Sequence, residues 1–240
     1  MGYPAIWCMS IELELNDEAE IGLIEQVRAT LFANITTSIV DDMFDGDEDV
    51  SVEHLGVLYL LIYGALIAGE WNKEFAPAAM STFRQALRSA RLRATGSVNR
   101  ETVRIRGARI GAFFGLTGRA CARSLGLDSD TETRMVNLLE DFGAVCGHVD
   151  DLLDFESDLA RGDRTNVVAL ALGAHINTNT ASYSTILRSS WGQARAKQFL
   201  EAEFIALAHQ AETAQWPRLA SRFRVAADNV FSSLSDSENV

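Results

Sequence analysis

Few helix breakers interrupt this chain, and that property limits the folds open to it. The 240 residues include only three prolines, and proline is the residue that a helix interior tolerates least. Long segments between them carry apolar residues every three or four positions, which is the period of an amphipathic helix. The pattern predicts an all-α protein. With 48% hydrophobic residues, we expect a single helical domain over residues 1–233 and a frayed polar tail at 234–240.

The predicted helices follow this periodicity and the breaks between its runs. They cover residues 17–45, 51–71, 76–94, 100–125, 131–159, 165–173, 179–212 and 216–233. Residues 55–69 are apolar on all faces, which predicts a central helix or the interface of a homodimer, with a membrane contact as the alternative. The run is shorter than the roughly 20 residues that a membrane span needs. We therefore expect no transmembrane segment.

Charge and cysteine content narrow the possible partners and compartment. The net charge of −12 disfavours nucleic acids and anionic membranes and suits a protein that binds cations. Cys8, Cys121 and Cys146 have neither the even number of a disulfide framework nor the spacing of a metal site. The first residues contain no basic segment or cleavage site typical of a secretory signal. These features predict a cytoplasmic protein.

A cluster of acids lies within residues 147–166, late in a predicted apolar helix. Asp150, Asp154 and Asp158 recur every four residues and so share one helix face, with Asp151 beside them. Like charges at this spacing repel by a few tenths of a kcal/mol, so a bound cation should offset their repulsion. The apolar residues around the acids predict that they point inward or into a cleft.

A second cluster lies upstream, where Asp41, Asp42 and Asp45 share a face near the end of a predicted helix. A calcium loop is not expected here, because Met43 and Val52 occupy positions that should supply oxygen ligands. Mg²⁺ is typically held by one or two carboxylates together with substrate phosphates. The two clusters together predict a Mg²⁺–diphosphate site, whereas either cluster alone is compatible with a solvated charged face.

The acid clusters give the chain a family resemblance. The D-D-x-x-D patterns at 41–45 and 150–154 resemble the two aspartate-rich motifs of the trans-isoprenyl diphosphate synthases and the related class I terpene synthases, over about residues 16–172. The resemblance implies a helical bundle of the isoprenoid synthase type with a central active-site cavity. It also implies an allylic prenyl diphosphate substrate and two or three Mg²⁺ ions.

The residues that the resemblance assigns to metal binding are Asp41, Asp42, Asp45, Asp150, Asp151, Asp154 and Asp158. All of these except Asp151 and Asp158 are also assigned to catalysis. Asp150, Asp154 and Asp158 can be read a second way, because they occupy the three ligand positions of the terpene cyclases' N-D-x-x-S-x-x-x-E motif.

Five arginines are candidate diphosphate ligands, since the guanidinium group suits phosphate oxygens. Arg104, Arg106 and Arg109 lie on the helix before the second cluster, and Arg161 and Arg164 follow that cluster. Arg109 falls near the phosphate-binding lysine of the elongating enzymes, and Arg104 near the arginine with which terpene cyclases sense the diphosphate. The alternative for each is a solvated charge.

Five aromatic residues are candidates for the walls of a cation pocket, because an aromatic ring attracts a carbocation. They are Phe44, Phe113, Phe114, Phe142 and Phe155. The alternative for each is ordinary core packing. His148, just before the second cluster, is interpreted either as a support for that cluster or as a helix-packing residue.

Basic residues are scarce where a second diphosphate would bind. Arg28 is the only Lys or Arg before the first Asp cluster, and none follows until Lys73. An unpaired buried phosphate is costly, so chain elongation with isopentenyl diphosphate is not expected. The favoured prediction is cyclisation of the allylic cation, as in a terpene synthase.

Two other functions stay open. Residues 87–115 and the N-terminal third resemble the moenomycin-type prenyltransferases, which implies transfer of the allylic group to an anionic lipid. Arg84, Arg88 and Arg91 form a stripe that would suit such an acceptor, although a solvated helix face is the alternative. The third possibility is a non-catalytic helical subunit of a heteromer.

Overall fold

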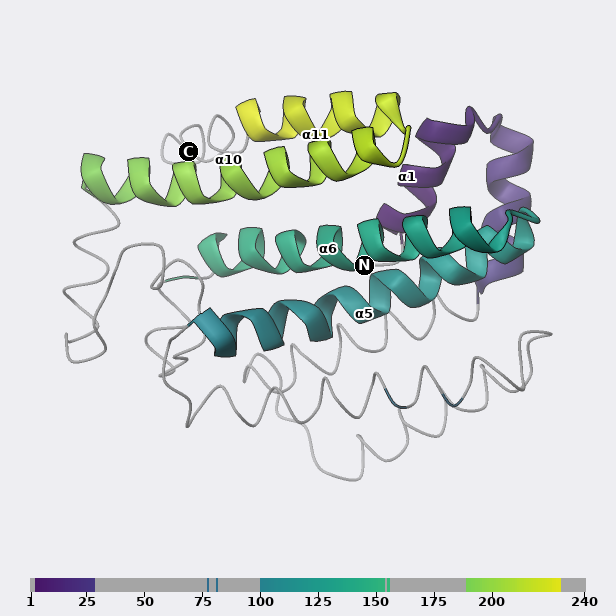
Figure 1. Cartoon of the computed structure of the whole chain (residues 1–240), viewed down its shortest axis with the longest axis horizontal. Helices are drawn as coiled ribbons and strands as arrows, with labels where there is room; N and C mark the ends of the chain where they lie inside the picture. The colour runs from purple at the N-terminus through teal and green to yellow at the C-terminus, as the bar shows by residue number, and fades with distance from the viewer. Residues whose placement is uncertain are drawn as a thin grey trace, which may run out of the picture. The chain divides into compact units, whose positions relative to one another are not determined.

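The computed structural model describes residues 3–28, 77, 81, 100–153, 155 and 189–229. These residues are almost entirely α-helical, and no strand occurs among them (Figure 1). The prediction of an all-α protein is confirmed for this part of the chain. Two compact units are distinguished, the first formed by Met1–Ala90 with Arg109–Glu140 and the second by Arg91–Ala108 with Asp141–Val240. Helices α5 (Arg100–Ser124) and α6 (Ser129–Leu153) contribute residues to both units.

The first unit begins with a helix that the sequence analysis did not predict, α1 (Tyr3–Leu13). Pro4 is tolerated there because it lies in the first turn, where a helix needs no N–H donor. The side chains at 5, 6, 8 and 9 are fully buried, which matches the spacing of one apolar helix face. A separate helix over residues 17–28 follows. Asn16 caps it, its Oδ1 accepting from the Ala19 N–H at 2.8 Å.

Within the first unit, glycines bring α5 very close to α6. A Cβ added to Gly111 would collide with the backbone carbonyl oxygen of Glu140, and one added to Gly118 would collide with the side chain of Leu139. At Gly115 the added Cβ would lie 2.5 Å from Cγ of Glu140. The two backbones are therefore closer than any larger side chain at these positions would permit.

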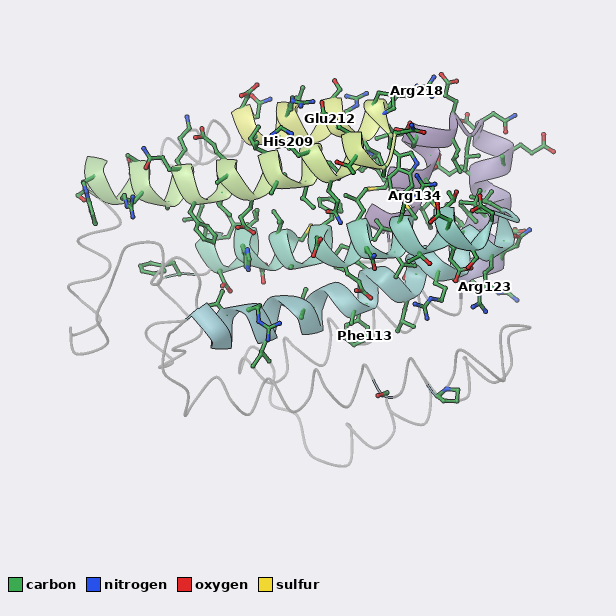
Figure 2. The ribbon with its side chains drawn as sticks, viewed as in Figure 1. Phe113, Arg123, Arg134, His209, Glu212 and Arg218 are labelled. Atoms are coloured by element: carbon green, nitrogen blue, oxygen red, sulfur yellow. The ribbon has the colours of Figure 1, made fainter. Side chains whose placement is uncertain are left out.

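The turn between α5 and α6 is closed by local hydrogen bonds. Gly126 has a φ of +66°, and the next N–H, from Leu127, donates to the Ala122 carbonyl at 2.9 Å. Asp128 then caps α6, accepting from the Thr131 N–H at 3.0 Å and from its hydroxyl at 2.7 Å. The predicted boundaries, 125 and 131, lie within two residues of the observed ones. Arg123, near the end of α5 (Figure 2), pairs with Glu132 at 3.3 Å.

The second unit contains the start of α5, the end of α6, α10 (Ser190–Thr213) and α11 (Pro217–Asn229). The last two form a hairpin (Figure 1). Arg224 of α11 forms an ion pair with Glu212 of α10. Phe223 of α11 packs on Phe142 of α6 with ring centroids 5.2 Å apart. The hairpin thus covers α6 through an apolar contact.

The prediction of one continuous helix over 179–212 is wrong. Ser189 is extended, with φ −74° and ψ 151°, and its hydroxyl accepts from the Gly192 N–H at 3.1 Å. The helix therefore begins at Ser190. The apolar period continues across the break, so periodicity alone did not distinguish a serine cap from a helix interior. Helix α11 begins one residue after its predicted start.

Several predicted helices lie wholly or largely outside the described residues. They are 51–71, 165–173 and most of 17–45 and 76–94. Among the helices that are described, none is long and apolar enough to cross a membrane. The apolar run at 55–69 lies outside the described residues, so this finding does not apply to it.

Candidate functional site

Two of the predicted metal ligands lie side by side in sequence near the end of α6, in the second unit. Asp150 is exposed, whereas Asp151 is buried with 2% of its surface accessible. Phe155, one turn beyond Asp151, is helical and 1% exposed. The face through 151 and 155 therefore points into the protein. Burying a carboxylate is costly unless it is paired or coordinated. The predicted inward-facing stripe runs through Asp150, but the buried acid is its neighbour Asp151, and Asp150 is exposed.

Helix α5 lies beside this end of α6. A Cβ added to Gly107 would lie 3.2 Å from Cβ of Ala144 and 3.5 Å from Nε2 of His148. The helices run antiparallel, so the turn before Gly107 lies next to the turn after His148. Arg104, which is exposed, occupies that turn of α5. A candidate phosphate ligand and the candidate metal ligands are thus on neighbouring turns of adjacent helices.

His148 fills the space between three helices. Its side chain is 12% exposed and its Nδ1 lies 3.5 Å from Oε2 of Glu203 on α10. The ring also packs on Phe199 of α10, with centroids 5.7 Å apart. Both ring nitrogens are buried without a hydrogen-bond partner. His148 thus packs between helices, and this packing gives no reason for two buried ring nitrogens without a hydrogen bond.

Acidic groups also line the α6–α10 contact. Burial raises the pKa of Asp141, and the negative charge of Glu203 raises it further, while a hydrogen bond from the Gln210 side chain acts in the opposite direction. Burial raises the pKa of the Cys146 thiol to about 12, and the charge of Asp150 adds to the shift. Burial is the main cause of both shifts, and the carboxylates of Glu203 and Asp150 add to them.

The predicted aromatic residues are buried. Phe113 and Phe114 lie in the first unit, and Phe142 and Phe155 in the second. Phe113 is seen on α5 in Figure 2. The contact between Phe142 and Phe223 is ordinary core packing between α6 and α11. For Phe142 the observed role is therefore the structural alternative, and the role in a cation pocket remains a prediction.

The other candidates fall outside what the structure describes. Arg106 and Arg109 are on α5, but their side chains are not described. The remaining positions lie outside the described residues and are Asp41, Phe44, Asp42, Asp45, Asp154, Asp158, Arg161 and Arg164. Within the described ranges alone, no group of three or more His, Cys, Asp or Glu residues is placed to hold a metal ion. Asp150 and Asp151 would need ligands from elsewhere in the chain.

Sequence reasoning missed the contact between Gly107 and His148. A signal was present, because Gly107, Gly111, Gly115 and Gly118 recur at helical spacing along α5. Small residues at this spacing allow close approach of a second helix. The pattern does not name the partner helix, which only the folded structure supplies.

Compared with family models, with curated proteins and with solved structures, the chain gives no match in any of the three. The family resemblance of the aspartate motifs therefore remains a prediction.

Proposed function

We propose that this protein ionises an allylic prenyl diphosphate in a Mg²⁺-dependent reaction and cyclises the resulting cation. The observation that carries the proposal is the close approach of Gly107 on α5 to Ala144 and His148 on α6. From this approach we infer that the turn with Arg104 lies beside the turn with Asp150 and Asp151. Carboxylates that bind Mg²⁺ and an arginine that binds phosphate are the two kinds of group that a departing diphosphate requires. The resemblance of the two Asp motifs supports the same chemistry.

The residues fit a hard cation by their chemistry, because Asp150 and Asp151 offer oxygen donors only. In this proposal Asp41, Asp42 and Asp45 would supply the facing ligands, with Asp154 completing the second motif. Bound Mg²⁺ would supply Lewis-acid stabilisation of the diphosphate.

The chain's own groups account for the remaining steps. Arg104 would hold the diphosphate oxygens as the C–O bond breaks and both of its electrons leave with the diphosphate. A double bond of the substrate would then attack the allylic cation, forming a ring. Loss of a proton or addition of water would complete the reaction. Apolar walls would exclude water until the ring has closed.

The test combines purified protein and Mg²⁺ with geranyl, farnesyl, geranylgeranyl or geranylfarnesyl diphosphate, each with and without isopentenyl diphosphate. Pyrophosphate and organic products are followed by mass spectrometry. We expect pyrophosphate and a cyclic hydrocarbon or alcohol without any acceptor. Pyrophosphate release only when an anionic lipid is added would identify a prenyltransferase instead, and no release under any condition would favour a non-catalytic subunit.

The site is tested by the variants Asp150→Asn and Asp151→Asn. Each should lower kcat/KM by about 100-fold or more, because the variant no longer helps to stabilise the charge of the leaving group. Asp130→Asn is the matched control on the same helix, since the Asp130 side chain is 81% exposed and forms an ion pair with Arg134 one turn away. Full activity in both site variants would exclude this end of α6 as the site.

A further inference from the structure

An unexplained feature of the second unit is the polar chemistry of His148. Neither buried ring nitrogen has a hydrogen-bond partner, and the side chain is 12% exposed. A buried donor or acceptor without a partner destabilises the fold, so an apolar residue would suit a purely structural position better. The three neighbours, Gly107, Phe199 and the stem of Glu203, would accommodate one.

The two ring nitrogens of His148 lie near different helices. Nδ1 faces Oε2 of Glu203 at 3.5 Å, which is just beyond hydrogen-bond length. A shift of a few tenths of an ångström would complete an Nδ1–H···O bond between α6 and α10. The opposite edge of the ring meets α5 at Gly107, with Nε2 3.5 Å from where a Cβ would lie. The ring, which is part of α6, therefore lies against both α5 and α10.

The geometry points to His148 as a positioning residue, held through Glu203, that sets the spacing between Arg104 on α5 and the Asp150–Asp151 pair on α6. Arg104 lies one turn from Gly107, and the acid pair begins two residues after His148. This inference rests on the proposed function, because it requires that a Mg²⁺–diphosphate complex bridges the two helices. It adds a supporting residue outside the aspartate motifs.

The test measures binding of inorganic pyrophosphate to the full-length protein in the presence of Mg²⁺ by titration calorimetry, together with the urea midpoint of each variant. His148→Leu should leave the midpoint unchanged or raise it, yet weaken binding on the order of tenfold, the usual cost of losing a residue that orients a ligand. His148→Gln keeps a donor and should bind nearly as well as the wild type. A purely structural role predicts the reverse ranking, or no change in affinity.

A second arm of the test changes Glu203, the carboxylate that lies opposite the His148 ring. Removing an acid near an anion site should strengthen anion binding by simple electrostatics. We expect Glu203→Ala to weaken it instead, to the same degree as His148→Leu, with no further loss in the double variant. Glu201→Ala on the same helix, whose carboxylate pairs with Lys197 at 3.5 Å, is the matched control and should not weaken binding.

A third arm tests the spacing itself. Gly107→Ala places a methyl group 3.2 Å from Cβ of Ala144. The two helices must then shift apart by a few tenths of an ångström, and binding should weaken. Adding Ala144→Gly removes the contact and should restore affinity. Wild-type affinity in His148→Leu, or equal losses in His148→Leu and His148→Gln, would overturn the positioning role while leaving the proposed function intact. Failure of the wild type to bind pyrophosphate with Mg²⁺ would overturn both.

Discussion

At the scale of single residues, three helix ends in the described part adopt positive φ. The residues are Glu14 at +52°, Gly126 at +66° and Gln215 at +65°. Each is followed by an N–H that donates to the carbonyl five residues back. These bonds run from Leu15 to Ser10, from Leu127 to Ala122 and from Trp216 to Ala211. Only one of the three positions carries glycine, the residue that adopts this conformation without a steric cost.

Gln215→Gly is therefore expected to stabilise the protein. The Gln215 side chain is exposed, so its removal relieves backbone strain and should raise the free energy of unfolding by about 1 kcal/mol. Gly126→Ala is the converse variant, because no atom lies within 4 Å of the added Cβ and only the backbone conformation is strained. It should lower the free energy of unfolding by a similar amount. Urea denaturation measures both, and a loss of stability in Gln215→Gly would contradict the argument.

The cap of α6 makes stability depend on pH. The pKa of Asp128 lies below its usual 3.8 because its carboxylate accepts from the backbone N–H of Thr131, then from the Thr131 hydroxyl and from Asp130. The folded state thus favours the ionised form. The stabilisation is complete above the unfolded pKa and is lost as the pH falls through the lower, folded pKa.

Asp128→Asn removes this titration and keeps an oxygen acceptor. We expect its unfolding free energy to lie below that of the wild type at neutral pH, with the difference shrinking as the pH falls below 3.8. Thermal unfolding of both proteins across this range measures the difference. A difference that is independent of pH would show that the carboxylate charge contributes nothing to the cap.

At the scale of elements, a glycine on α5 permits the short distance between α5 and α6. A methyl group at Gly111 would meet the backbone carbonyl oxygen of Glu140, and a backbone atom cannot rotate away as a side chain can. The helices would have to separate, with loss of packing around buried Leu138 and Leu139. This contact therefore determines how closely α5 and α6 can approach in the first unit.

Gly111→Ala should lower the free energy of unfolding by about 2 kcal/mol, as expected for overpacking of a tight interface. Gly22→Ala is the control in a helix with open space, where no atom lies within 4 Å of the added Cβ. It should raise stability by up to about 1 kcal/mol, because alanine is the better helix former. Equal effects in the two variants would show that helix propensity, and not packing, dominates at Gly111.

At the scale of the whole molecule, the division into two units bears on cooperativity. Each unit is built from separate stretches of chain, and both α5 and α6 pass from one unit to the other. A helix that loses its packing in one unit loses part of its support in the other. We therefore expect the units to unfold together in one transition.

The reactivity of one thiol in each unit measures whether the two units unfold together. Cys121 belongs to the first unit and Cys146 to the second, and burial raises the pKa of each thiol to about 12. At about pH 8 neither should react with dithionitrobenzoate while the protein is folded, because the thiolate is the reactive form. In variants that retain only Cys121 or only Cys146 of the three cysteines, the two thiols should become reactive at the same urea concentration. Earlier exposure of one would show that its unit opens independently.

Sequence reasoning identified α5 and the start of α11 closely, because these helices are long, periodic and bounded by turn residues. It missed α1, which is short, and it joined α10 to the segment before Ser189, whose cap does not disturb the apolar period. For the candidate site it placed Asp150, Asp151 and Arg104 on the correct helices. It treated the acid stripe through Asp150 as inward-facing, whereas Asp151 is the buried member of the pair.

The sequence by itself determined that this protein is helical where the structure describes it, because the period of apolar residues and the rarity of breakers act within each segment. It also placed acids and arginines at helical spacing, since spacing along a helix is local geometry. Only the tertiary structure decided which helices meet, that Gly107 faces His148, and that Glu203 stands opposite its ring. Those contacts join residues far apart in the chain, and their distances depend on how side chains fill the space between helices, which no local pattern encodes.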